Sequence, residues 1–207
     1  MEFQYRKQNR LQNYDYSQYG AYFITICTKN REPFLSTITV PQNKTADPNV
    51  ILTPFGQIVE NYINMIPTKY PNTKIDAYVI MPDHVHMILV IVGDGSAVPQ
   101  DKTNAVPENK NNAIPQNKIA GPQDKTNTAP HNTKNGRANP APTVGNIMGW
   151  FKYTTTKQMA HCWNTSDNRL WQRSYHDHII RNEQDYRNIC QYINENPIRW
   201  LQKHSHH

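Results

Sequence analysis

Apolar and polar positions alternate along the chain in a way that predicts four strands and three helices. Apolar or alternating runs predict strands at residues 21–28, 74–81, 84–92 and 169–178. Apolar residues at helical spacing predict helices at residues 54–66, 143–161 and 183–196. The resulting order is strand, helix, strand, strand, helix, strand, helix.

This order predicts an α+β fold with a ferredoxin-like or RRM-like antiparallel sheet, carrying helices on one face, plus an additional C-terminal helix. We expect the other face of the sheet to be left for a ligand. Thr53 is the predicted N-cap of the first helix, Pro54 its first residue, and Pro67 closes its pattern. Asn182 is the predicted N-cap of the last helix, which should end near Asn196 and Pro197.

The composition changes sharply between residues 94 and 142. Prolines 99, 107 and 115 recur every eight residues among polar residues, with hardly any large apolar side chain. Such a repeat cannot bury enough surface to offset chain entropy, so we expect a disordered insertion. Residues 1–93 and 143–203 should therefore form a single domain, and residues 204–207 a tail.

Charge and cysteine content indicate which class of partner and which cellular compartment to expect. The formal net charge of +6 favours a polyanionic partner such as nucleic acid. The three cysteines are widely separated and lack C-x-x-C spacing, which is typical of reduced thiols. No secretory signal is visible, and the longest apolar run, residues 87–92, is too short to span a bilayer. We therefore expect a cytoplasmic protein with no membrane partner.

Two histidines open the predicted strand that follows the Pro82-Asp83 turn. Side chains alternate along a strand, so His84 and His86 point to one face while Val85 points into the core. Two imidazoles on one face supply two thirds of a small metal site. A strand also carries two histidines by chance, so the pair needs a third ligand to become significant.

The last predicted helix offers that ligand and a candidate nucleophile. Its buried stripe, which includes Tyr186 and Ile193, lies at i, i+3, i+4 and i+7 spacing. Tyr192 lies at the edge of this stripe, with Asn196 one turn further on. An amide oxygen at Asn196 can complete a His-His-oxygen set for a hard divalent cation.

Several motifs together resemble the REP-associated tyrosine transposases, relatives of the single-tyrosine HUH transposases. The motifs are HVH, GWFKYTTTKQ, WQRSYHDHIIRN, DYRNICQYINENP and, near the N-terminus, YDYSQYGAYFITICTKNREPFL. The resemblance covers almost all of the chain outside residues 94–142. It implies that His84 and His86 bind the metal and that Tyr192 is the nucleophile. It also places the third, polar ligand on Asn196, where some relatives have Gln.

The implied reaction is cleavage and rejoining of DNA. A phenol has a pKa near ~10, so a tyrosine nucleophile needs a neighbouring cation or base. The resemblance implies a Mg²⁺ or Mn²⁺ ion on the scissile phosphate and a 5′-phosphotyrosine intermediate with a free 3′-hydroxyl. The implied substrate is single-stranded or hairpin DNA resembling repetitive extragenic palindromes. Relatives include monomers and homodimers, so the oligomeric state stays open.

Further residues are candidate DNA contacts, although ordinary surface positions explain them equally well. They are Arg173, His178, Arg181, Arg187 and Lys152. Two alternative functions remain: a non-catalytic module that binds DNA hairpins or RNA through an RRM-like sheet, and a zinc hydrolase. The zinc hydrolase would use a second His-x-His, His176 and His178, together with His84 and His86.

Overall fold

The computed structural model describes residues 18–40, 48–92, 142–163 and 170–204. Its elements in chain order are β1 (Gly20–Cys27), the 3₁₀ turn η1 (Lys29–Arg31), β2 (Ser36–Thr39), β3 (Asn49–Leu52), α1 (Pro54–Lys69), β4 (Thr73–Ile80), β5 (His84–Ile91), α2 (Val144–Trp163), β6 (His176–Ile180) and α3 (Glu183–His204). Residues 94–141 of the predicted insertion lie outside the described residues.

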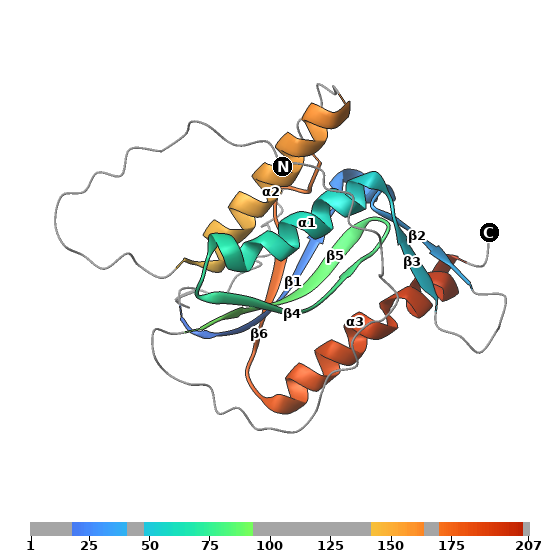
Figure 1. The fold of residues 1–207 in the computed structure, drawn as a ribbon. Coiled ribbons are helices and arrows are strands. Elements are labelled where there is room, and N and C mark those ends of the chain that lie inside the picture. The colour runs from blue at the N-terminus through green and yellow to red at the C-terminus, as the bar shows by residue number, and fades with distance from the viewer. Residues whose placement is uncertain (1–17, 41–47, 93–141, 164–169, 205–207) are drawn as a thin grey trace, which may run out of the picture. The chain divides into compact units, whose positions relative to one another are not determined.

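Four strands form one antiparallel sheet in the order β4-β5-β1-β6, and β2 pairs with β3 in a separate two-stranded sheet. Helices α1 and α2 cover one face of the larger sheet, and α3 lies along the other face (Figure 1). The predicted α+β, ferredoxin-like fold with an additional C-terminal helix is confirmed. The expectation of an open second face is wrong, because α3 packs on it.

The two faces of the sheet bury very different amounts of apolar surface. The core under α1 and α2 includes Tyr22, Ile24, Ile26, Val59, Ile63, Val85, Met87, Leu89, Ile147 and Phe151. Among the described residues, the cluster under α3 has three buried members, Ile88, Ile189 and Ile193, with partly buried neighbours around them. Helix α3 is therefore held by a much smaller apolar contact than the rest of the domain.

Both predicted N-caps are confirmed, but both helices continue past the prolines that were expected to end them. Thr53 Oγ1 accepts a hydrogen bond from Gly56 N at 3.2 Å, and Asn182 Oδ1 accepts one from Asp185 N at 2.8 Å. Helix α1 continues past Pro67, and α3 continues past Pro197. A proline removes only one backbone hydrogen bond. Only Thr68 and Lys69 follow Pro67 in α1, whereas the turn after Pro197 carries Trp200, which packs beside His84.

The continuation of α3 changes the predicted tail. His204 is the last residue of α3, and its ring stacks on Trp200 with centroids 4.0 Å apart. Residues 205–207 lie outside the described part of the chain. In the described ranges, no helix combines the length and the apolar character needed to cross a membrane.

The sequence did not predict the β2–β3 hairpin, whose strands are only four residues long. The hairpin is joined to the turn before His84: Leu35 N donates to Pro82 O at 2.9 Å, and Ser36 Oγ donates to Ile80 O at 2.8 Å. The last strand of the sheet also begins later than predicted, at His176, while Trp171 makes only an isolated bridge to Thr28.

Candidate active site

His84 and His86 lie at the start of β5 on the face of the sheet that α3 covers. Their ring centroids are 4.5 Å apart and both residues are buried. Val85, between them, is buried in the core on the opposite face. The alternation expected of a strand therefore brings the two imidazoles together, as the sequence predicted.

Helix α3 crosses this pair with a row of residues at i, i+4 and i+8. The Tyr192 ring centroid lies 5.2 Å from that of His86, and the Trp200 centroid lies 6.2 Å from that of His84. Asn196 lies between Tyr192 and Trp200 on the same helix face and is buried. The predicted nucleophile and the predicted third ligand thus both face the histidine pair, about a hundred residues away in the chain.

One ring nitrogen of His86 has a hydrogen-bond partner, and the other has none among the described residues. Its Nδ1 is 2.8 Å from Thr25 Oγ1, while its Nε2 is buried with no hydrogen-bond partner among the described residues. Burial lowers the pKa of His86 to about 3, and the nearby charges of His84 and Arg31 add to the shift. His86 is therefore neutral at pH 7. A metal ion on Nε2 requires the proton to be on Nδ1, where Thr25 Oγ1 can accept it.

His84 is held by the carboxylate of Asp83, which the sequence indicated only as a turn residue. His84 Nδ1 donates to Asp83 Oδ1 at 2.5 Å, and Arg31 Nε donates to Asp83 Oδ2 at 2.8 Å. The adjacency of Asp83 to His84 was a visible signal for this contact. Arg31 carried no such signal, because its approach to Asp83 depends on how β1 and β5 pair.

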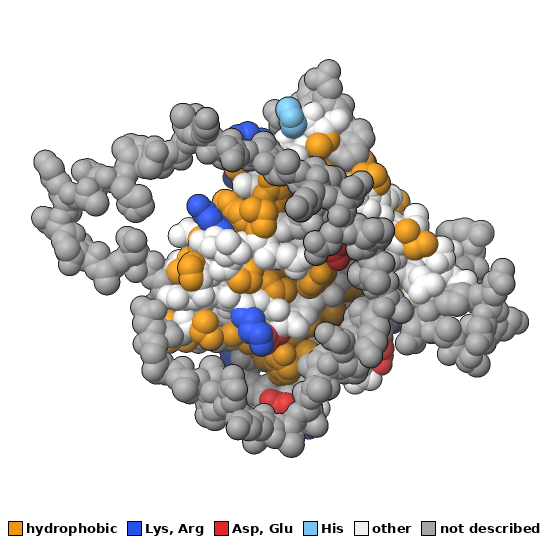
Figure 2. All heavy atoms as spheres, viewed as in Figure 1, with side chains coloured by type: hydrophobic (Ala, Val, Ile, Leu, Met, Phe, Trp, Pro, Cys, Tyr) orange, Lys and Arg blue, Asp and Glu red, His pale blue; other side chains and the backbone are white. Residues whose placement is uncertain are grey.

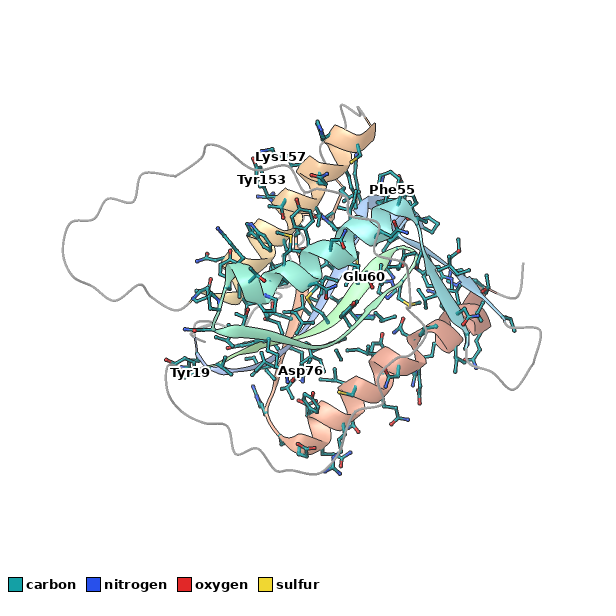
Figure 3. All side chains as sticks on the ribbon, viewed as in Figure 1. Tyr19, Phe55, Glu60, Asp76, Tyr153 and Lys157 are labelled. Atoms are coloured by element: carbon teal, nitrogen blue, oxygen red, sulfur yellow. The ribbon has the colours of Figure 1, made fainter. Side chains whose placement is uncertain are left out.

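The two tyrosines of α3 have different surroundings. Tyr186 donates its hydroxyl to Asp76 Oδ2 at 3.2 Å, and Figure 3 shows Asp76 between the sheet and α3. Burial raises the pKa of Tyr186, and the Asp76 charge adds to the rise, so Tyr186 stays a neutral phenol. Tyr192, in contrast, is 37% exposed and lies edge-on to both His86 and Phe23. Of the two, Tyr192 is the one accessible beside the histidines.

The candidate DNA contacts are spread over the molecule. Arg173 lies at the His84 end of the sheet, because neighbouring Gln172 N bonds to Cys27 O, and Cys27 pairs with His84. His178 pairs with Asp185 in the first turn of α3, about 16 Å along the helix from Asn196.

Arg181 and Arg187 are exposed at the same end of α3, where Arg187 pairs with Glu183. Lys152 lies across the sheet on α2, and its ammonium donates to the carbonyl oxygens of Gln172 and Arg173. Burial lowers the pKa of Lys152. Lys152 therefore holds the backbone at Gln172 and Arg173, on the side of the sheet away from α3. On the face seen in Figure 2, the coloured Lys and Arg side chains lie apart from one another.

The alternative prediction of a zinc site built from four histidines is wrong. Across the described ranges, no group of three or more His, Cys, Asp and Glu side chains is placed to hold a metal ion. His178 is instead exposed and hydrogen-bonded to Asp185 through Nε2. The arrangement that remains is two imidazoles and one amide, beside an accessible tyrosine.

The fold and this site define a ferredoxin-like α+β protein in which a His-x-His strand faces a tyrosine-bearing helix. No protein-family model matches the chain. An uncharacterized protein of Haemophilus influenzae is 31% identical over 198 residues, covering 96% of this chain and 91% of that protein. The chain belongs to the same family as that protein.

Two solved structures also align with the chain. One is a REP-associated tyrosine transposase bound to a REP hairpin, with a TM-score of 0.47 and 18% identity over 96% of this chain and 74% of that one. The other is a candidate transposase from Deinococcus radiodurans, with a TM-score of 0.40 and 16% identity over 91% of this chain and 96% of that one. Their names agree with the family that the sequence motifs resemble, but similarities this low assign no activity to the chain.

Proposed function

We propose that this protein cleaves and rejoins single-stranded, hairpin-bearing DNA, using Tyr192 as the nucleophile beside a divalent metal ion. The observation that carries the proposal is the contact between Tyr192 and His86, whose buried Nε2 has no hydrogen-bond partner among the described residues. The motifs that resemble REP-associated tyrosine transposases supply the reaction class and the DNA substrate.

The residues at the site fit Mg²⁺ or Mn²⁺. His84 has Nδ1 occupied by Asp83, which leaves Nε2 for a cation, and His86 Nε2 is likewise available. The Asn196 amide oxygen is the third proposed ligand, since hard divalent ions favour oxygen donors. When bound, the ion would polarise the scissile phosphate and stabilise charge on the leaving oxygen.

The reaction balances with groups that the chain and the DNA supply. The Tyr192 hydroxyl oxygen attacks the phosphorus, loses its proton, and forms a phosphotyrosine bond to the 5′ side as the bond from phosphorus to the 3′-oxygen breaks. The 3′-oxygen takes up a proton and becomes a free hydroxyl. A 3′-hydroxyl can later attack the phosphotyrosine, rejoin the strand and restore Tyr192 without ATP.

One chain carries the whole proposed set of residues. Tyr192 approaches His86 of its own chain, and Asn196 follows on the same helix face. We therefore propose that the reaction proceeds within one chain, without exchange of α3 between two copies. The binding-module alternative loses support, because α3 covers the sheet face on which an RRM-like module would stack bases.

The test is formation of a covalent adduct with a labelled, hairpin-bearing single strand in Mg²⁺ or Mn²⁺. We expect the wild-type chain to give a metal-dependent adduct, resistant to denaturant and abolished by EDTA. Tyr192→Phe should abolish the adduct and change DNA affinity less than about threefold, because it removes one oxygen and leaves the surface intact. Tyr186→Phe is the matched control on the same helix and should retain the adduct.

Two results would count against the proposal. An adduct that persists in Tyr192→Phe and disappears in Tyr186→Phe would place the nucleophile on Tyr186. A wild-type chain that binds hairpin DNA or RNA but forms no adduct with any metal would favour the non-catalytic binding module.

A further inference from the structure

A chain of side-chain contacts leads from Arg31 through Asp83 to the ring of His84. Arg31 Nε donates to Asp83 Oδ2 at 2.8 Å, and Asp83 Oδ1 accepts from His84 Nδ1 at 2.5 Å. The side chains of Asp83 and His84 are only 7% and 8% exposed. We propose that Asp83 is a positioning residue for His84 and is itself anchored by Arg31. This inference rests on the metal site of the proposed function.

The carboxylate of Asp83 can decide which nitrogen of His84 carries the proton. A neutral imidazole has one N–H, and an ionised carboxylate only accepts hydrogen bonds. The proton is therefore held on Nδ1, and Nε2 keeps its lone pair for a cation. The same contact fixes the rotation of the ring, as carboxylates behind metal-binding histidines commonly do.

Asp83 is fixed from more than one side. Its backbone carbonyl accepts hydrogen bonds from Thr28 N at 2.9 Å and from Thr28 Oγ1 at 3.0 Å. Arg31 is oriented in turn by donation from Nη1 to Cys27 Sγ at 2.8 Å. The end of β1 and the turn that follows it thus hold both the backbone and the carboxylate of Asp83.

The backbone of that turn supports the same conclusion. Asn30 and Arg31 have φ values of 56° and 60°, in the left-handed region that non-glycine residues seldom adopt. Two consecutive residues of this kind persist only where surrounding contacts favour them, and such strain concentrates at functional sites. At Arg31 these contacts are the ones to Asp83 and Cys27. The strained turn therefore places the guanidinium beside the Asp83 carboxylate.

The two histidines are supported unequally. His86 Nδ1 meets Thr25 Oγ1, a neutral hydroxyl that can either donate or accept, so this contact alone does not fix the proton. His84 is therefore the histidine whose tautomer and ring orientation are fixed before a metal ion binds. Removing such a supporting partner typically lowers metal affinity about 10- to 100-fold.

The experiment compares Asp83→Ala and Asp83→Asn with wild type in the full-length chain. Asp83→Asn is nearly isosteric and covers the case in which Asp83→Ala fails to fold. Mn²⁺ affinity, measured by electron paramagnetic resonance of free Mn²⁺, should fall about 10- to 100-fold in Asp83→Ala and less in Asp83→Asn. Long-range ¹H–¹⁵N correlation in metal-free protein should show His84 as the Nδ1–H tautomer in wild type and as a mixture in Asp83→Ala. A His84→Gln variant assigns the signal.

The matched control is Asp185→Ala, which removes the carboxylate from the other Asp–His pair, His178–Asp185. It should leave Mn²⁺ affinity and the His84 tautomer unchanged. Wild-type Mn²⁺ affinity retained in both Asp83 variants would overturn the positioning role while leaving the metal site intact. If wild type binds no Mn²⁺, the proposed metal site fails, and the metal-free spectra still decide: an unchanged His84 tautomer in Asp83→Ala contradicts the inference, and a mixture supports it.

Discussion

Ile193→Ala should release α3 from the sheet without unfolding the rest of the domain. Ile193 is 2% exposed and belongs to the three-residue buried cluster under α3. Removing three buried carbons at ~0.8 kcal/mol each costs about 2.4 kcal/mol, and the cavity left behind raises the expected loss to about 3–4 kcal/mol. Because Ile88 of β5 and Ile189 of α3 are the other buried members of this cluster, α3 loses much of its attachment.

Hydrogen exchange of the α3 amides measures this release directly. A loss of about 3 kcal/mol corresponds to a decrease of roughly two orders of magnitude in protection. The yield of covalent adduct and the Mn²⁺ affinity should fall with it, because Tyr192 and Asn196 are both carried by α3. Amides of β1, which is buried under α1 and α2, should keep more of their protection.

The matched control is Ile63→Ala in α1, which removes the same three carbons from a residue that is 0% exposed on the other face of the sheet. It should lower the free energy of unfolding without selectively exposing the α3 amides. If both variants reduce α3 protection equally, α3 and the sheet form one cooperative unit, and the reasoning from the small cluster is refuted.

Two further predictions concern Tyr192 and Tyr78. Arg199→Ala should slow adduct formation about two- to fivefold, because the guanidinium carbon lies 5.5 Å from the Tyr192 ring centroid, a contact of about 0.5–1 kcal/mol. Gln184→Ala, which removes an i,i+4 hydrogen bond to Asn188 on the same helix, should leave the rate unchanged in single-turnover assays, and equal slowing would point to helix stability instead. Burial, with the Glu60 charge, raises the pKa of Tyr78 to about 12. This folded-state pKa exceeds the unfolded one, so the stabilisation is fully present below about pH 10 and is lost as the pH rises towards 12. Urea unfolding should show this slope in wild type and a smaller one in Tyr78→Phe; equal slopes would contradict it.

The sequence predicted the parts of the site that depend on local backbone geometry. Alternation along a strand placed His84 and His86 together and sent Val85 to the core, and the structure agrees. Helical spacing separated Tyr186, which packs against the sheet, from Tyr192 at the edge of the stripe. Cap chemistry located the starts of α1 and α3 at Thr53 and Asn182.

Local rules failed where packing between distant segments decides the outcome. The sequence ended α3 near Pro197, yet the helix continues to His204, and Trp200 lies beside His84. Charge alone made Lys152 a candidate phosphate contact, and only packing showed that its ammonium donates to the carbonyl oxygens of Gln172 and Arg173. The short β2–β3 hairpin was missed because strands of four residues carry too little periodicity to be recognised.

By itself, the sequence determined that a His-x-His strand and a helix with an accessible tyrosine both exist, because these follow from repeats of two and 3.6 residues along the backbone. Only the tertiary structure decided that they meet. The packing of Ile189 and Ile193 against Ile88 brings Tyr192 to His86, and the pairing of β1 with β5 brings the turn after β1, and with it Arg31, to Asp83. Such contacts depend on how separate segments fill space against one another, which no local repeat encodes.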